Sequence, residues 1–503
     1  MEVSAYANVS PLRRLRFVVV LALSLMAGCA VGPDFTRPDA PNASDYTTHP
    51  VASTVAAPNV AGGESQRFAK GSDIPGDWWT LFHSPSLNEL IEQSLAHNHD
   101  LKAAQAALTV ARENVLAQRG YYYPSATASF SASRTKQSES ISPTPNSNTF
   151  LYNLYTPQVS ISYVPDIFGL NRRTTESVQA QEQAVRFEMI AAQITLSTNV
   201  VAAVVQAGAL QAQIDATREL IDLNTHMVKI LREQLAKGYA SGLDVAAQES
   251  QLEQTRATLP PLIKQLAQQR DLLAALVGAV PNQAPDARFE LASLQLPQEL
   301  PLSLPSALVA QRPDVLQAEA NMHAASAQIG VAIANRLPNI VLSANAGSTA
   351  LAMDQLFKSG TGFWGLGADI TAPIFQGGTL LHQERAAKAA YVQAAEQYRS
   401  TVLAAFQNVA DTLTALQQDA EGLRAAAAAA DAAKRTLDLS QRQLTAGYAN
   451  YLSLLNAQQT YQQARINLVQ AQANRYADTA ALFQALGGGW WNRTDLAQDK
   501  NDK

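Results

Sequence analysis

Cysteine and charge are both scarce in this sequence, and each shortage excludes a class of function. A single cysteine, Cys29, occurs among 503 residues, so neither an intrachain disulfide nor a metal site made of several cysteines can form. Charged residues make up only 16% of the chain, and the formal net charge is −5. Because a nucleic-acid-binding protein needs a basic face to meet phosphates, we expect no nucleic-acid partner.

Catalytic signatures are also missing. The sequence contains no Gly-x-Ser-x-Gly, no His-Glu-x-x-His and no phosphate-binding loop motif. Gly365-Leu366-Gly367 is too short for a dinucleotide fingerprint and lies in an alternating, strand-like stretch. His97 and His99 are two residues apart, which places them on different faces of a helix. The sequence therefore predicts a protein that is not an enzyme and that has neither cofactor nor metal.

The first 28 residues have the pattern of an export signal. Three arginines precede an apolar run, residues 17–27, that is too short to span a bilayer as a helix but is typical of a signal peptide. Its end, Met26-Ala27-Gly28-Cys29, resembles the lipobox of bacterial lipoproteins, in which the cysteine becomes the acylated first residue. Several acyl chains, palmitate among them, would anchor the protein stably in a membrane. The alternative is plain cleavage near Gly28 with Cys29 unmodified; in both cases the mature protein leaves the cytoplasm.

Composition and repeats divide the rest of the chain. Residues 32–76 are rich in proline and small polar residues without any helical or strand period, so we expect an extended linker rather than a folded unit. The predicted segments are a signal peptide, a lipid-anchored N-terminal segment, two repeats and a polar tail, at residues 1–28, 29–77, 78–297, 298–491 and 492–503.

The two repeats are identified by motifs that recur in the same order. Residues 234–240, Gln-Leu-Ala-Lys-Gly-Tyr-Ala, recur as Gln-Leu-Thr-Ala-Gly-Tyr-Ala at 443–449. Ile167-Phe168-Gly169 recurs at 374–377, and the helix that ends at Arg119 before Pro124 recurs as the one that ends at Arg336 before Pro338. Such order indicates a tandem duplication. The spacing between these motifs places a longer loop in the first copy, around residues 141–152.

Each copy has the same predicted elements. A helix of about thirty residues comes first, at 86–118 and 306–335, followed by two strands, a very long helix at 172–237 or 379–446, a short turn and another long helix. A solvated single helix is one interpretation of such length. However, the apolar stripe that begins at Ile190 and Ile194 needs a partner, so we expect coiled-coil packing of helix on helix.

The predicted strands alternate between apolar and polar residues. Near 125–132, 159–163, 339–346 and 364–370, apolar side chains recur at every second position, with Val341 as an exception. A soluble sheet packed on a helix gives the same pattern. An export signal, four such strands and aromatic residues at the strand ends favour a transmembrane barrel instead. The aromatic residues are Tyr121, Tyr122, Tyr123, Tyr152, Tyr155, Phe168, Phe363 and Phe375.

Four strands are too few to close a membrane barrel, because the smallest known kind has eight. Open sheet edges are excluded from lipid, where their backbone groups find no water. Two chains would give eight strands, whose interior is filled by side chains. Three chains would give twelve strands and a lumen, so the sequence predicts a homotrimer.

The chain resembles the outer-membrane factors of tripartite efflux pumps, which are the TolC- and OprM-like channels. The resemblance is greatest to their lipoprotein branch, which serves RND-type transporters. The resemblance covers nearly the whole mature chain and rests on these marks: Cys-Ala-Val-Gly-Pro-Asp-Phe at 29–35, Trp78-Trp79 followed by Leu87, Leu90 and Asn98, Arg-Pro-Asp-Val at 312–315, and Gly-Gly-Gly-Trp-Trp at 487–491. It implies a mainly α-helical fold with a transmembrane β-barrel, in which the trimer forms a twelve-stranded barrel and a twelve-helix periplasmic tunnel. The partners that the resemblance implies are outer-membrane lipid, a periplasmic adaptor protein and an inner-membrane transporter of RND type.

Site residues also follow from the resemblance. The turns at 238–242 and 447–451 would contact the adaptor, through Gly238, Tyr239, Gly242, Asp244, Gly447 and Tyr448. Leu452, Asn456 and Gln459 would form the periplasmic gate. Asn456 stands where relatives often carry aspartate and Gln459 where some carry arginine, so the acidic gate of the family is not expected. Asp244 could supply an acid near the tip, or could instead cap the following helix.

The function implied is a passive, gated conduit that exports drugs or other toxic small molecules across the Gram-negative outer membrane, a role linked to antibiotic resistance. Two alternative functions are compatible with the sequence. A channel for type I protein secretion would share the fold and differ in its partner. A periplasmic adaptor or structural protein would use the same coiled coils without a membrane barrel, and salt rather than detergent would release it from the membrane.

Overall fold

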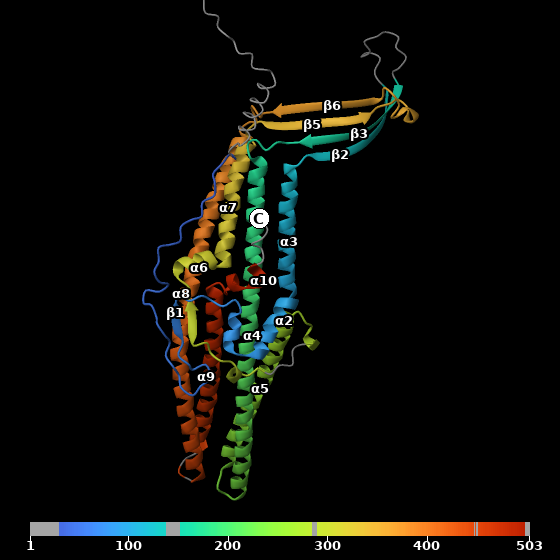
Figure 1. Ribbon diagram of the computed structural model, residues 1–503. Coiled ribbons are helices and arrows are strands. Elements are labelled where there is room, and N and C mark those ends of the chain that lie inside the picture. The colour runs from blue at the N-terminus through green and yellow to red at the C-terminus, as the bar shows by residue number, and fades with distance from the viewer. Residues whose placement is uncertain (1–29, 137–150, 284–288, 447, 449–450, 498–503) are drawn as a thin grey trace, which may run out of the picture. The chain divides into compact units, whose positions relative to one another are not determined.

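A computed structural model describes residues 30–136, 151–283, 289–446, 448 and 451–497 (Figure 1). The chain forms two compact units, each built from separate parts of the sequence. Unit 1 contains residues up to 37 together with 109–184 and 318–397, and unit 2 contains 38–108, 185–317 and 398 onward. Cys29 and Gly447 lie outside the described residues.

Unit 1 contains an antiparallel sheet of four strands. β2 (Ser125–Lys136), β3 (Leu151–Tyr163), β5 (Asn339–Ser348) and β6 (Gly362–Thr371) follow one another in that order, so β2 and β6 are the edges. The four predicted strands are confirmed, and each is longer than its alternating core. Leu151 and Tyr152, expected in the long loop of the first copy, belong to β3, and the rest of that loop lies outside the described residues.

The strand register gives this sheet one apolar and one polar face. Ala128, Val159, Ala346 and Trp364 form one row across the strands, and Thr127, Ser160, Asn345 and Gly365 form the row beside it on the opposite face. The apolar face comprises residues 126, 128, 130 and 132 of β2, 157, 159, 161 and 163 of β3, 340, 342, 344 and 346 of β5, and 364, 366, 368 and 370 of β6. Seven of its large side chains, among them Phe130, Trp364 and Leu366, are 42% to 78% exposed, and Tyr163 and Ile340 are half-buried. No part of the described chain therefore covers the apolar face.

The helices repeat in the same order in each copy, which confirms the duplication. The first copy has α2 (Pro85–His97), α3 (His99–Arg119), α4 (Leu170–Ala236) and α5 (Gly242–Leu276). The second has α6 (Pro305–Gln311), α7 (Pro313–Ala334), α8 (Thr379–Thr445) and α9 (Tyr451–Ala485). α4 and α8 each contain 67 residues, and both contribute to the two units. Short elements complete the fold: η1 (Trp78–Phe82), η2 (Gly120–Tyr122), η4 (Pro281–Gln283), η5 (Leu291–Ser293), η6 (Met353–Gln355), η7 (Trp490–Asn492) and α10 (Thr494–Ala497).

Two predicted helices, 86–118 and 306–335, are each broken into two, so the single-helix prediction is wrong in both copies. In the first copy, Asn98 ends α2, and its side-chain oxygen accepts a hydrogen bond from the backbone N–H of Leu101 at 2.9 Å, which caps α3. In the second copy, Pro313 cannot donate a backbone hydrogen bond and disfavours helical geometry at Arg312. The Arg312 guanidinium fills this break and donates to the carbonyls of Ala405 and Ala485.

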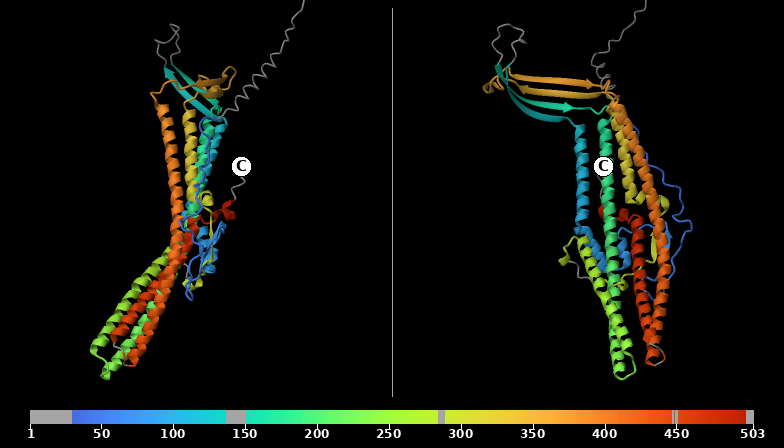
Figure 2. Two further views of the ribbon diagram at one scale, coloured as in Figure 1. Left: turned by 90° about the vertical axis from the view of Figure 1, so that its left-hand side faces the viewer. Right: turned by 180° about the vertical axis from the view of Figure 1, so that it is seen from behind.

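The long helices of unit 2 pack as two hairpins, α4–α5 and α8–α9, which lie side by side in both views of Figure 2. Near their ends, Met227 and Leu231 of α4, Val245 of α5, Leu437 of α8 and Leu454 of α9 share one buried cluster. One stretch of α4 is apolar enough to cross a membrane by length and composition, but 67% of it is buried inside the protein, as in a core helix. The predicted packing of helix on helix is confirmed.

The proline-rich segment 32–76 is not a free linker, which corrects the prediction from composition. β1 (Arg67–Lys70) pairs in parallel with β4 (Glu299–Leu302), and its neighbour Gln66 is fully buried. Gln66 Nε2 donates to the carbonyl of Pro297 at 3.0 Å and to Thr479 Oγ1 of α9 at 3.1 Å. Composition could not predict this docking, because proline is also compatible with an extended chain that docks on helices through backbone and side-chain hydrogen bonds.

Candidate functional site

The turn between α4 and α5 presents an exposed aromatic residue. Gly238 has a φ of +78°, the left-handed conformation that ends a helix, and Tyr239 beside it is 82% exposed. Gly242, predicted as part of the turn, is the first residue of α5. In the second copy, Tyr448 occupies the corresponding position and is 88% exposed. Both hairpins of unit 2 therefore end in a solvent-exposed tyrosine.

Asp244 caps α5. Its Oδ2 accepts hydrogen bonds from the backbone N–H of Ser241 at 3.0 Å and from Ser241 Oγ at 2.6 Å, while Ser241 Oγ accepts from the backbone N–H of Asp244. This reciprocal pair is a capping box. Hydrogen bonds from Ser241 lower the pKa of the Asp244 carboxyl. Asp244 thus takes part in the cap of α5 from the third helical position, whereas the N-cap itself is Ser241. Its role as an acid near the tip stays a prediction.

The three predicted gate residues lie on one face of α9. Leu452, Asn456 and Gln459 are spaced by four and three residues, so they follow one another along the helix surface, and all three are exposed. The opposite side of this helix, with Leu454 and Gln458, is buried. In a single chain the face with Asn456 is therefore free for water or for a neighbouring subunit.

A partly buried amide network near this face was not predicted from the sequence. Gln459 Nε2 donates to Gln251 Oε1 of α5 at 2.9 Å, and Gln248 Nε2 of α5 donates to Asn224 Oδ1 of α4 at 3.0 Å. Asn224 Nδ2 in turn donates to Thr255 Oγ1 at 3.2 Å. The network links α4, α5 and α9 through hydrogen bonds rather than through apolar contact alone. The signal available in the sequence was the placement of these polar residues among the apolar positions of long helices.

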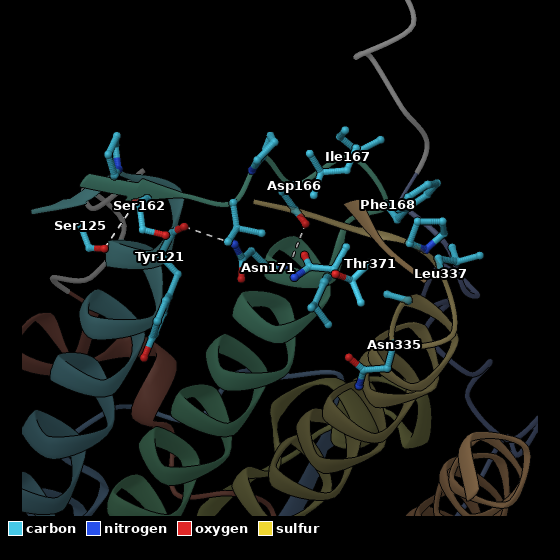
Figure 3. A pocket seen from close by; sticks show the side chains of 18 of the residues that line it. Tyr121, Ser125, Ser162, Asp166, Ile167, Phe168, Asn171, Asn335, Leu337 and Thr371 are labelled. Carbon is cyan, nitrogen blue, oxygen red and sulfur yellow. Dashed lines mark hydrogen bonds between the residues drawn. The ribbon is translucent and has the colours of Figure 1, made fainter. Parts of the chain in front are cut away.

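In unit 1 the polar face of the sheet borders a hollow of about 990 Å³, shown in Figure 3. Ser125, Ser162, Asn339 and Thr371 line it from the polar face. The adjoining ends of α3, α4 and α7 supply its other wall. The hollow is therefore a water-accessible recess on the side of the sheet opposite to the apolar face.

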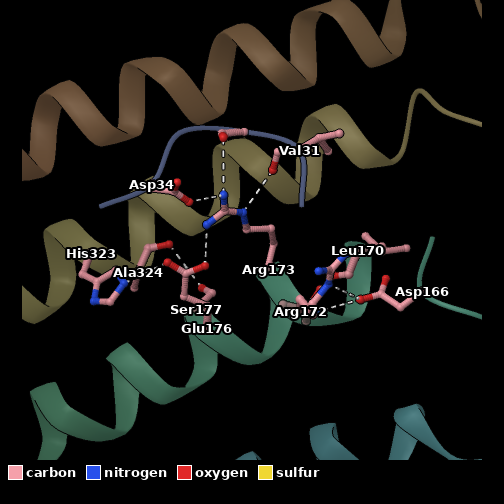
Figure 4. Close-up of polar contacts among 12 residues, drawn as sticks. Val31, Asp34, Asp166, Leu170, Arg172, Arg173, Glu176, Ser177, His323 and Ala324 are labelled. Atoms are coloured by element: carbon pink, nitrogen blue, oxygen red, sulfur yellow. Dashed lines mark hydrogen bonds and ion pairs between the residues drawn. The ribbon is translucent and has the colours of Figure 1, made fainter. Parts of the chain in front are cut away.

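Also in unit 1, the first described residues are held by Arg173 of α4 (Figure 4). This guanidinium is 5% exposed in its side chain and donates to the carbonyls of Val31 and Gly32, to Asp34 at 2.7 Å and to Glu176 at 2.7 Å. The space is tight as well, because a Cβ on Gly32 would lie 2.5 Å from Gly330 Cα. We refer to residues 30–37 as the clamped segment.

Phe35 and Arg37 attach the same segment to α7. The ring of Phe35 stacks on His323 with 4.3 Å between centroids, and His323 Nε2 lies 2.9 Å from Glu176 Oε1. Arg37 forms an ion pair with Glu319 at 2.9 Å. The chain that follows Cys29 is thus fixed to the helices of unit 1 within a few residues.

Replacing Arg173 with methionine is expected to release the clamped segment. Hydrogen bonds from a charged donor contribute about 1.5–3 kcal/mol each, and several are lost together, so local opening is expected to become about 100-fold more frequent. Hydrogen exchange of peptide 30–37, followed by mass spectrometry, measures this change. Arg385→Met removes an exposed arginine of α8 in the same unit and serves as the control. Equal exchange in both variants would show that Arg173 does not hold the segment.

Nothing in the described part of the chain resembles a metal centre, since no group of three or more His, Cys, Asp or Glu side chains converges there.

Comparisons with known proteins agree with this geometry. The sequence model of the family described as "Outer membrane efflux protein" matches residues 90–279 and 304–488, one stretch in each repeat. A probable efflux pump outer membrane protein of Pseudomonas putida, TtgC, is 31% identical over 95% of this chain and 96% of its own length. The pyoverdine export outer membrane protein OpmQ of Pseudomonas aeruginosa is 30% identical over 88% and 94%.

Solved structures show the same fold. The outer-membrane channel OprN superposes with a TM-score of 0.81 at 26% identity, over 92% of this chain and 100% of that one. The outer membrane protein VceC of Vibrio cholerae gives a TM-score of 0.76 at 28% identity, over 82% and 99%. The sheet with one apolar face, the duplicated long hairpins and these similarities lead to one conclusion. The chain belongs to the outer membrane efflux protein family and is the outer-membrane component of an efflux pump.

Proposed function

We propose that three copies of this chain form a lipid-anchored channel through which an inner-membrane pump, reached through a periplasmic adaptor, exports small toxic molecules. The observation that carries the proposal is the sheet of unit 1, which has an uncovered apolar face and two unpaired edges, β2 and β6. Lipid tolerates the apolar face but not the edges, because backbone groups without partners cost several kcal/mol there. Joining β6 of one copy to β2 of the next removes every edge.

The same arrangement supports the roles proposed for the other surfaces. The polar face of the sheet would line the lumen, and the exposed tyrosines Tyr239 and Tyr448 would contact the adaptor. The face of α9 with Leu452, Asn456 and Gln459 would form the narrowest part of the channel, with residues from three copies facing one another. The printed names of the relatives, which describe efflux of toluene, antibiotics or pyoverdine, favour small-molecule efflux over type I protein secretion. Acylation of Cys29 and an RND-type transporter remain part of the proposal.

The gate is tested by recording ion currents from the purified protein in planar bilayers. Asn456→Asp would add one carboxylate per subunit, and thus three at the constriction, so cation preference is expected to rise severalfold at low salt. Asn199→Asp, at an exposed position of α4, makes the same chemical change outside the proposed constriction. An unchanged selectivity in Asn456→Asp would remove α9 from the gate, and absence of any channel current would contradict the proposed function itself.

A further inference from the structure

Two basic residues continue the apolar face of β2 toward its end. Arg134 and Lys136 follow Phe130 and Ala132 at every second position, so they belong to the same face of the strand. Both are exposed, and neither has an ion pair or side-chain hydrogen bond with any residue in the described ranges. Within the described residues these positive charges have no counter-charge, in a chain whose net charge is −5.

Their height along the strand follows from strand geometry. The opposite end of β2, Ser125, adjoins η2 and α3, so Arg134 and Lys136 lie at the end away from the helices. At about 3.4 Å per residue and a tilt of about 40°, the nine steps from Ser125 to Arg134 rise about 23 Å. The apolar band of an outer-membrane barrel is about 25 Å tall. Arg134 therefore falls at the far border of the band and Lys136 just beyond it.

The neighbouring side chains fit the same border. Tyr155 of β3 pairs with Ala132 and Trp364 of β6 with Ala346, and both rings lie on the apolar face in the half of the sheet away from the helices. Aromatic rings of this kind concentrate where hydrocarbon meets headgroups. A cation on this face cannot be solvated by the lumen, which lies on the other side of the sheet. Lipid headgroups at this border offer it counter-charges.

We propose that Arg134 and Lys136 together bind the phosphate group of an anionic lipid in the leaflet that faces away from the helices. The inference rests on the proposed membrane-spanning barrel and adds a lipid specificity to it. Arginine and lysine two residues apart on one strand face offer several N–H donors to one phosphate. Acyl chains would lie on the apolar face below, along Phe130 and its neighbours. The site would therefore recognise a whole lipid rather than a free anion.

Native mass spectrometry of the full-length trimer released from detergent tests this proposal. Phosphatidylglycerol and phosphatidylcholine are titrated separately, and dissociation constants are obtained for successive bound lipids. Each basic residue near an anionic headgroup contributes about fivefold in affinity at low salt. In R134Q/K136Q the preference for phosphatidylglycerol is expected to fall at least tenfold. K434Q/R435Q, which removes two exposed charges from α8, is expected to keep the preference.

Two outcomes would overturn the proposal. One is a phosphatidylglycerol preference that survives in R134Q/K136Q or falls equally in K434Q/R435Q. The other is displacement of the lipid by inorganic phosphate beyond the effect of chloride at matched ionic strength, since that would identify the site as one for free phosphate. Failure of the proposed function is recognised separately, because a chain that forms no trimer or conducts no current in planar bilayers fails before the lipid titration is made.

Discussion

Replacing Arg475 with methionine is expected to destabilise unit 2 by about 3–5 kcal/mol. This guanidinium is 1% exposed, and it donates to the carbonyl of Leu416 at 2.9 Å, to Thr54 Oγ1 at 2.8 Å and to the carbonyl of Glu64 at 3.1 Å. It thus ties the N-terminal segment to α8 and α9. Methionine fills most of the volume but removes all three hydrogen bonds, and the carbonyl of Leu416 and Thr54 Oγ1 lose a charged donor in a buried place.

The loss is expected to be visible as a local opening as well as a lower melting temperature. Trypsin is expected to cut after Arg67 faster in Arg475→Met, because release of Thr54 and Glu64 leaves only the hydrogen bonds of Gln66 and the pairing of β1 with β4 to hold this part of the described chain. Arg424→Met removes an arginine of α8 whose side chain is 56% exposed and paired with nearby Glu421, and it is expected to change stability by less than about 0.5 kcal/mol. Similar melting temperatures for the two variants would contradict the role given to Arg475.

The second large effect is a dependence of stability on pH that originates at Asp419. Burial, together with the adjacent carboxyl of Asp478, raises the pKa of Asp419 to about 7. One carboxylate oxygen of Asp419 is buried and has no hydrogen-bond partner among the described residues. A proton shared between the two carboxyls supplies that partner. The charged groups around them are Arg475 of α9, which opposes the shift, and Glu64 of the N-terminal segment, which interacts with Arg475.

The sign follows from the two pKa values of Asp419. An aspartate in the unfolded chain loses its proton near pH 4, whereas the folded protein keeps it up to about pH 7. The stabilisation is therefore complete below pH 4, falls as the pH rises through this window, and is lost above about pH 7. Asp419 is partly exposed, so screening by solvent limits the change to about 2 kcal/mol.

Asp419→Asn tests this assignment, because an amide donates a hydrogen bond to Asp478 at every pH. Thermal unfolding between pH 4.5 and 8 is expected to show a smaller decline with pH in this variant than in the parent protein, and a higher melting temperature at pH 8. Asp431→Asn changes an exposed carboxyl of the same helix and is expected to leave the decline unchanged. Parallel curves for the parent and Asp419→Asn would exclude Asp419 as the source.

Much of the fold could be predicted from the sequence, because its main elements are long and strictly periodic. The predicted ends of α4 and α8 lie within two residues of those observed, and the alternation in β2 assigned its two faces correctly. The breaks at Asn98 and Arg312 were missed, since each depends on a side chain whose partner is far away in the sequence. Asn98 Nδ2 donates to the carbonyl of Leu276, and Arg312 to that of Ala485.

The candidate site was predicted less completely. Positions such as Leu452 and Asn456 could be assigned to an exposed face because helical spacing determines it. Buried polar contacts could not be assigned, because the same residue types also occur on water-facing surfaces. Arg173, Arg475 and Gln251 are examples: composition suggests solvated side chains, yet each forms hydrogen bonds across helices or to the N-terminal segment. Local pattern carries no information on which distant acceptor such a donor meets.

The unpaired edges of the sheet also have a genetic consequence. If β2 of one copy must pair with β6 of the next, every channel contains three copies of this chain. A subunit that assembles but cannot open then inactivates each channel that it enters. In a cell that makes equal amounts of normal and gate-defective chains, only about one eighth of the trimers would contain no defective subunit. Gate variants would therefore be dominant. Variants that prevent strand pairing would be recessive, because they never enter the assembly.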